Sequence, residues 1–249
     1  MARTARKRIG SIGRSWLSMQ RQWFRDSGDI DVADEGFAPL RVVGICALWA
    51  LVHSVLASKQ SKDLARRFAV PRYRDGLYRF AFNAQSVVSL VWAALQFSRL
   101  PDRELYRVGP PWSWLFRASQ AASLCVLLSG VWVMGTLRFA GLTSLRDVLR
   151  GGNVRPAPEA QGPPLGSDDE VVKAGAFRFS RHPGNLGALG FFLFLPRMTA
   201  NRAVLLALVA LYVVLGSMHE EHRLRAAYGA AYERYRRAAP FLVPARPRG

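Results

Sequence analysis

RHPGNLGALGFFLFLPRMTANRAVLLALVALYVVLGSMHEE, residues 181–221, contains two apolar runs separated by one short polar turn. The runs cover residues 186–195 and 203–215, and the turn between them reads PRMTANR. Each run is short for a membrane crossing, which needs about 20 apolar residues in a helix. Both helices can extend into the flanking residues, from about position 183 to position 218. The stretch therefore predicts a helical hairpin that crosses the membrane twice.

Three more apolar segments precede this hairpin, at residues 40–57, 77–97 and 112–139. Each is long enough to cross a hydrocarbon core of about 30 Å as a helix. A soluble all-α bundle is the alternative, but its buried helices usually keep a polar stripe, which these segments lack. The sequence predicts an all-α integral membrane helical bundle of about five transmembrane helices, with a C-terminal hairpin and a cytoplasmic tail.

The chain has a formal net charge of +18 although half of its 249 residues are apolar. The basic residues lie between the apolar segments, where they favour anionic lipid headgroups. We expect the lipid bilayer as a partner and no nucleic acid, because zinc-finger spacing and an aromatic-basic strand pattern are both missing. Residues 1–25 contain no acid, and their apolar residues recur at helical spacing. An interfacial amphipathic helix and a disordered basic tail both fit them.

The Lys and Arg residues indicate how the helices are oriented. With five crossings, the loops at residues 58–79 and 141–183 share one face with the C-terminal tail, and this face has more Lys and Arg. The positive-inside rule makes it cytoplasmic, although the basic N-terminal tail then lies on the opposite side. We expect an integral protein of a bacterial inner membrane with its active site on the cytoplasmic side.

Four regions follow from this division of the chain. We expect a basic amphipathic tail at residues 1–38, transmembrane helices 1 to 3 at residues 39–150, and a Gly/Pro-rich loop at residues 151–176. Residues 177–249 form the hairpin and the C-terminal tail.

A polar motif opens the hairpin. Pro183 suits the first turn of a helix, which puts Arg181 and His182 at the helix mouth, where free N–H groups attract an anion. The motif thus favours a carboxylate or phosphate. Gly187 belongs to a stripe of glycines three residues apart, which allows a backbone or a flat ligand to approach closely.

A second polar cluster, HEEH, follows the hairpin at residues 219–222. Glu220 and Glu221 are either ligand-binding acids or a solvated helix end. A metal site is not favoured, because a metalloprotease motif needs two histidines four residues apart and these are three apart. A di-iron motif needs a histidine where Arg223 stands. We expect no metal.

A third candidate is His53, near the end of the first apolar segment. A polar side chain at this depth is a functional candidate, and the alternative is a histidine that hydrogen-bonds a neighbouring helix.

The three clusters together resemble the membrane methyltransferases related to isoprenylcysteine carboxyl methyltransferase. The resemblance rests on the His-Ser element at residues 53–54, on Arg-His-Pro-x-x-x-Gly at residues 181–187 and on Glu-Glu-x-x-Leu-x-x-x-Tyr-Gly-x-x-Tyr-x-x-Tyr at residues 220–235. The His-Ser element and residues 141–149 are most similar to the methanethiol S-methyltransferase branch and its denitrification-linked relatives. The superfamily also includes phospholipid N-methyltransferases.

The resemblance implies S-adenosyl-L-methionine, bound between the hairpin and the C-terminal tail. The Arg-His-Pro element lies near that cofactor, and Glu220 and Glu221 meet its amino and ribose groups. The chain departs from the family at Asn185, which stands where relatives usually have Tyr. Asn can hydrogen-bond but cannot stack, so we assign Asn185 and Gly187 to the cofactor site with this contact changed.

The predicted function is an integral membrane methyltransferase that uses S-adenosylmethionine to methylate a small thiol or a lipid-soluble acceptor. His53 is the predicted catalytic residue, because a neutral imidazole can take or orient a thiol proton. One alternative is a catalytically silent membrane protein of the same fold that binds a ligand or a partner. Another is an isoprenylcysteine or phospholipid methyltransferase.

Overall fold

The computed structural model describes residues 36–68, 70–152, 154 and 161–243. Its elements are, in order, the helix Gly36–Ala57, α2 (Lys59–Phe68), α3 (Pro71–Ser98), β1 (Glu104–Arg107), α4 (Trp112–Met134), α5 (Thr136–Phe139), α6 (Leu142–Leu149), the 3₁₀-helix η1 (Gly175–Arg178), α7 (Pro183–Leu193), β2 (Arg197–Thr199) and α8 (Ala200–Ala238). The predicted N-terminal amphipathic tail lies mostly outside the described residues.

Four of the described helices are long and apolar enough to cross a membrane: Gly36–Ala57, Gly76–Ser98 within α3, Trp112–Met134 and Ala200–Ala238. Large apolar side chains on all four point outward, among them Leu48, Val88, Leu128 and Leu211. An outward apolar surface is what a bilayer solvates. The predicted all-α membrane bundle is confirmed.

The predicted hairpin is formed by α7 and α8, but its first helix is short. Helix α7 has 11 residues, about 16 Å at 1.5 Å per residue. It packs along α4 from Gly130, which faces Pro183, to Phe116, whose ring lies 6.2 Å from that of Phe194. Gly187 permits this packing, because a Cβ there would collide with a carbonyl oxygen of α4.

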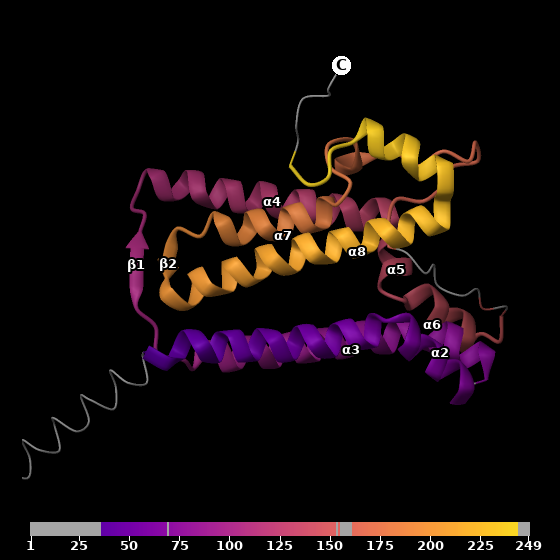
Figure 1. The fold of residues 1–249 in the computed structure, drawn as a ribbon, viewed down its shortest axis with the longest axis horizontal. Coiled ribbons are helices and arrows are strands. Elements are labelled where there is room, and N and C mark those ends of the chain that lie inside the picture. The colour runs from indigo at the N-terminus through magenta and orange to yellow at the C-terminus, as the bar shows by residue number, and fades with distance from the viewer. Residues whose placement is uncertain (1–35, 69, 153, 155–160, 244–249) are drawn as a thin grey trace, which may run out of the picture.

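A two-stranded antiparallel pairing holds one end of the bundle together. Strand β1 connects α3 to α4, β2 connects α7 to α8, and the two strands pair with each other (Figure 1). Glu104 of β1 also forms an ion pair with Arg197 of β2 at 2.6 Å. The hairpin turn and the α3–α4 loop thus lie at the same end, while α2, α5 and α6 lie at the other.

The length of the third apolar segment, residues 112–139, predicts one helix, but the structure divides it into two. Helix α4 ends at Met134 because Gly135 adopts a φ of 85°, a conformation that glycine adopts without steric cost. The short helices α5 and α6 follow, and α6 packs against the start of α3, where Gly76 contacts Val148. These helices lie at the end of the bundle opposite β1 and β2.

Helix α8 continues well beyond the apolar run and then reverses direction. Gly229, with φ 52° and ψ −126°, breaks the helix. The last turns fold back over η1 and the start of α7 (Figure 1). A small core forms there, made by Val171, Phe177, Leu224, Ala231, Tyr232, Tyr235 and Ala239. This reversal brings the C-terminal tyrosines to the Arg-His-Pro motif.

Candidate active site

Arg181 and His182 lie at the mouth of α7, as the sequence predicts. Pro183 begins the helix, and His182 immediately precedes it with a non-helical backbone. The His182 ring is buried and packs edge-on against Phe241, with ring centroids 5.3 Å apart. Arg181 is held by its backbone N–H, which donates to the carbonyl of Pro240 at 3.0 Å.

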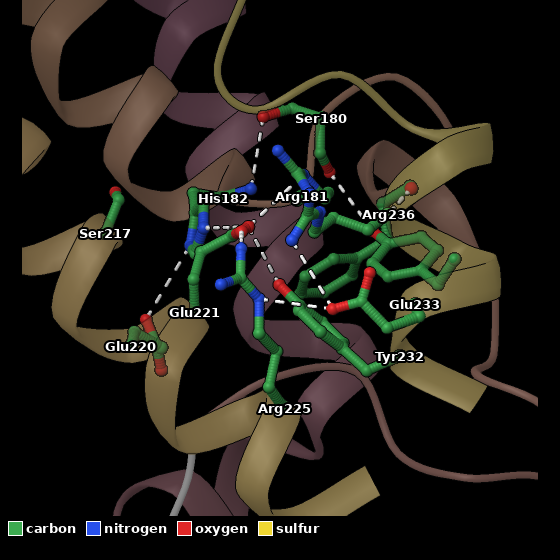
Figure 2. Close-up of polar contacts among 12 residues, drawn as sticks. Ser180, Arg181, His182, Ser217, Glu220, Glu221, Arg225, Tyr232, Glu233 and Arg236 are labelled. Carbon is green, nitrogen blue, oxygen red and sulfur yellow. Dashed lines mark hydrogen bonds and ion pairs between the residues drawn. The ribbon is translucent and has the colours of Figure 1, made fainter. Parts of the chain in front are cut away.

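Figure 2 shows four side chains that converge on the carboxylate of Glu221, one of which, Arg225, reaches Oε2 at 3.4 Å. Tyr232 donates its hydroxyl hydrogen to Oε1 at 2.9 Å, and Nε2 of His182 lies 3.2 Å from the same oxygen. Nε of Arg181 forms an ion pair with it, also at 3.2 Å. Arg181, His182, Glu221 and Tyr232 are called the Glu221 network below. It joins the two polar motifs that flank the hairpin.

The charges in this network favour a protonated His182. Burial lowers the pKa of the ring, but hydrogen bonds and charges from Glu220 and Glu221 outweigh it, so the pKa of His182 is raised above 6.5. Nδ1 of His182 lies 3.8 Å from Oε2 of Glu220. A protonated ring between two carboxylates is attracted to both of them.

A cavity of about 1180 Å³ lies between α8, α3 and the helix Gly36–Ala57. One face of α8 lines it with residues at helical spacing: Tyr212, Leu215, Gly216, His219, Glu220 and Arg223. Asn185 of α7 also lines this large cavity, whereas Arg181, His182 and Glu221 do not. The Glu221 network therefore forms a buried layer behind the cavity wall, and Glu220 is the acid of the pair that faces the cavity.

His53 lines the same large cavity from the opposite side. Its Nδ1 lies 3.1 Å from the hydroxyl oxygen of Ser86, and its ring stacks on Trp49 at 4.8 Å. The rings of Phe82 and Tyr212 lie 4.9 Å and 6.5 Å from it. If Nδ1–H donates to Ser86, Nε2 is left as an acceptor. The three clusters of the sequence thus meet around one space.

The remaining predicted residues have separate positions. Asn185 donates from Nδ2 to the hydroxyl of Ser217 at 2.7 Å, which links α7 to α8. Pro183 and Gly187 both pack on α4 rather than on the large cavity. Within the described ranges, no group of three or more His, Cys, Asp or Glu side chains is arranged to hold a metal ion.

Sequence reasoning missed Ser86 and Tyr212, both of which contact His53. Ser86 has no local signal, because its role depends on how α3 packs against another helix. Tyr212 does have one: it lies on the same helical face as Glu220, eight positions earlier, which is a little over two turns.

Similar proteins bear the same enzyme name. Methanethiol S-methyltransferase 1 of Bradyrhizobium diazoefficiens is 25% identical over 200 residues, 80% of this chain and 65% of the relative. Methanethiol S-methyltransferase of Crocosphaera subtropica is 27% identical over 204 residues, 81% of this chain and 73% of the relative. The predicted resemblance is confirmed. Methanethiol S-methyltransferase 2 of B. diazoefficiens is 38% identical over 68 residues, 27% of this chain and 26% of the relative.

The similarity covers only part of the first relative, and it is to individual proteins rather than to a family profile or a solved structure. The match spans less than two thirds of the first relative, at 65% of its length. No protein-family profile matches this chain, and no solved structure matches it.

Proposed function

We propose that this chain is an integral membrane methyltransferase that uses S-adenosylmethionine to methylate a small thiol, with methanethiol as the first substrate to test. The observation that carries the proposal is that His53, Asn185 and Glu220 line one cavity. The names of the relatives support the thiol acceptor. We further propose a bacterial inner membrane location, with the Glu220 end of the large cavity at the cytoplasmic face.

The large cavity suits the methyl donor. Its volume of about 1180 Å³ exceeds that of most small-ligand pockets and leaves space for a second, small molecule. Glu220 offers a carboxylate to an ammonium or to ribose hydroxyls, and Asn185 still has its carbonyl oxygen available. Tyr212 and Phe82 offer aromatic faces to a cation. The residues present therefore fit this cofactor.

The Glu221 network serves the site indirectly. Glu221 already accepts a hydrogen bond from Tyr232 and pairs with Arg181 and His182, so we assign it to holding His182 rather than to touching the cofactor. A protonated His182 in turn attracts the carboxylate of Glu220, whose Oε2 lies 3.8 Å from Nδ1. Arg181, His182 and Glu221 are thus positioning residues, and Pro183 and Gly187 set the place of α7 against α4.

S-adenosylmethionine, when bound, would supply an activated methyl group, because the neutral thioether that carries it leaves readily. His53 would take the thiol proton on Nε2 and so leave the acceptor sulfur as a thiolate. Ser86 keeps the ring in the required tautomer from the other nitrogen. The aromatic rings around His53 exclude water, which leaves alignment as the main contribution of the protein.

A turnover assay tests this function. The detergent-purified or nanodisc-embedded protein receives cofactor labelled at the methyl group, with methanethiol, a prenylcysteine or phosphatidylethanolamine as acceptor. We expect labelled dimethyl sulfide. Label in the prenylcysteine or the lipid alone shows a different acceptor. Cofactor binding without any transfer identifies the silent protein of the same fold.

A further inference from the structure

A second, smaller cavity of about 350 Å³ adjoins the large one. It lies where α4 ends, and it is lined by Arg79, Met134, Arg138, Phe139, Gln161, Gly162, Pro164, Leu165 and Tyr228. Arg79, Phe139 and Gln161 line both cavities. The two spaces therefore meet at these three residues.

Two arginines give the small cavity a positively charged lining. Arg79 and Arg138 both line it and repel each other, and no ion pair joins either of them to a carboxylate whose side chain the structure describes. Two like charges beside a partly buried space cost free energy unless an anion lies between them. Guanidinium groups are well suited to bind a carboxylate through paired hydrogen bonds.

Tyr228 lies close both to this positive charge and to Glu220, the acid of the large cavity. It lines the small cavity and lies within electrostatic range of both Arg138 and Glu220. A negative group and a positive group thus both lie near Tyr228. An α-amino acid has the complementary pair, an ammonium and a carboxylate on the same carbon atom.

We propose that Arg79 and Arg138 bind the carboxylate at the amino-acid end of the methyl donor, while Glu220 binds its ammonium. This inference rests on the proposed function and names the part of the donor that the small cavity takes. Arg181 and His182, which the sequence suggested for this carboxylate, already face Glu221. The nucleoside then lies in the large cavity, and the acceptor lies at the His53 end.

Two related ligands isolate the carboxylate. S-adenosylhomocysteine carries the amino-acid end, and methylthioadenosine is a nucleoside thioether without it. Dissociation constants for both are measured with the full-length protein in nanodiscs, for wild type, Arg79→Gln and Arg138→Gln. Arg146→Gln is the matched control, because Arg146 is an exposed arginine at the same end of the bundle and pairs with Asp147.

We expect wild type and Arg146→Gln to bind S-adenosylhomocysteine at least about tenfold more tightly than methylthioadenosine. This difference is the effect of one charged hydrogen bond. Arg79→Gln and Arg138→Gln lose most of that preference but bind methylthioadenosine as wild type does, which also shows that they fold. A full preference in both variants overturns the subsite and leaves the proposed function standing. Failure of wild type to bind either ligand overturns both.

An anionic lipid is the competing source of a negative group. Thermal stabilisation by phosphatidylglycerol that disappears in Arg79→Gln and Arg138→Gln, with the ligand preference unchanged, assigns the arginines to a lipid phosphate and contradicts the proposal. If phosphatidylglycerol stabilises wild type and all three variants equally, the result supports binding of the donor carboxylate by the two arginines.

Discussion

Tyr232 donates a 2.9 Å hydrogen bond to Glu221, although it lies 11 residues further along the same helix. In a continuous helix this separation is about 16 Å. The contact exists because α8 breaks at Gly229 and folds back. One glycine thus places the buried layer that supports the cavity wall.

Gly229→Ala should destabilise the protein by about 1–3 kcal/mol, because an L side chain rarely adopts its φ of 52° and ψ of −126°. No atom lies within 4 Å of a Cβ at this position, so the cost is backbone strain rather than a collision. Gly44→Ala is the control, since Gly44 is helical and equally open. A thermal unfolding scan in detergent compares them, and equal unfolding temperatures would contradict the role of the break.

Glu220→Gln and Glu221→Gln should have different effects on stability and on cofactor binding, although the two residues are neighbours. Glu221→Gln removes the charge that faces Arg181 and His182, so we expect a loss of stability of about 3 kcal/mol or more. Glu220→Gln should unfold close to wild type but weaken cofactor binding by about 1–3 kcal/mol. Unfolding scans and calorimetry measure the two effects. The opposite pattern would mean that Glu221 faces the ligand.

His182 gives the stability a definite pH dependence. Its pKa in the folded protein is raised above 6.5, so its contribution is fully present below the unfolded pKa and is lost as pH rises through the folded pKa. We expect the unfolding temperature to fall above pH 6.5 more steeply in wild type than in His182→Gln. His222→Gln, at an exposed histidine of α8, should follow wild type. Parallel curves for wild type and His182→Gln would contradict the buried cation.

The orientation of the bundle is also testable. Because the Arg/Lys-rich loops lie at the end that holds α2, α5 and α6, we expect the C-terminus in the cytoplasm and the N-terminus on the opposite side. Alkaline phosphatase and fluorescent-protein fusions at each end report the side. Two ends on one side would show that the short helix α7 does not complete a crossing.

Much of the fold could be predicted because apolar runs determine which segments enter a bilayer. The end of α4 at Met134 could not be predicted, because the sequence does not show that Gly135 adopts a positive φ. Nor could the sequence separate Glu220 from Glu221. Neighbouring helical residues point about 100° apart, so the two carboxylates can lie in different surroundings, and only the packing of α8 decides which one faces the cavity. Gly229 is part of the Tyr-Gly pair of the C-terminal motif, and nothing in that sequence shows that the chain reverses direction there.

We propose that one cavity holds the donor near Glu220 and the acceptor at His53. These ends are about 12 Å apart along α8, judged from Tyr212 beside His53 and Glu220. The most direct measurement is cofactor affinity together with methanethiol turnover in wild type, His53→Ala and Glu220→Gln. We predict that His53→Ala binds the cofactor like wild type but turns over far more slowly, while Glu220→Gln loses affinity. Turnover of His53→Ala at the wild-type rate, or wild-type affinity in Glu220→Gln, would contradict the claim.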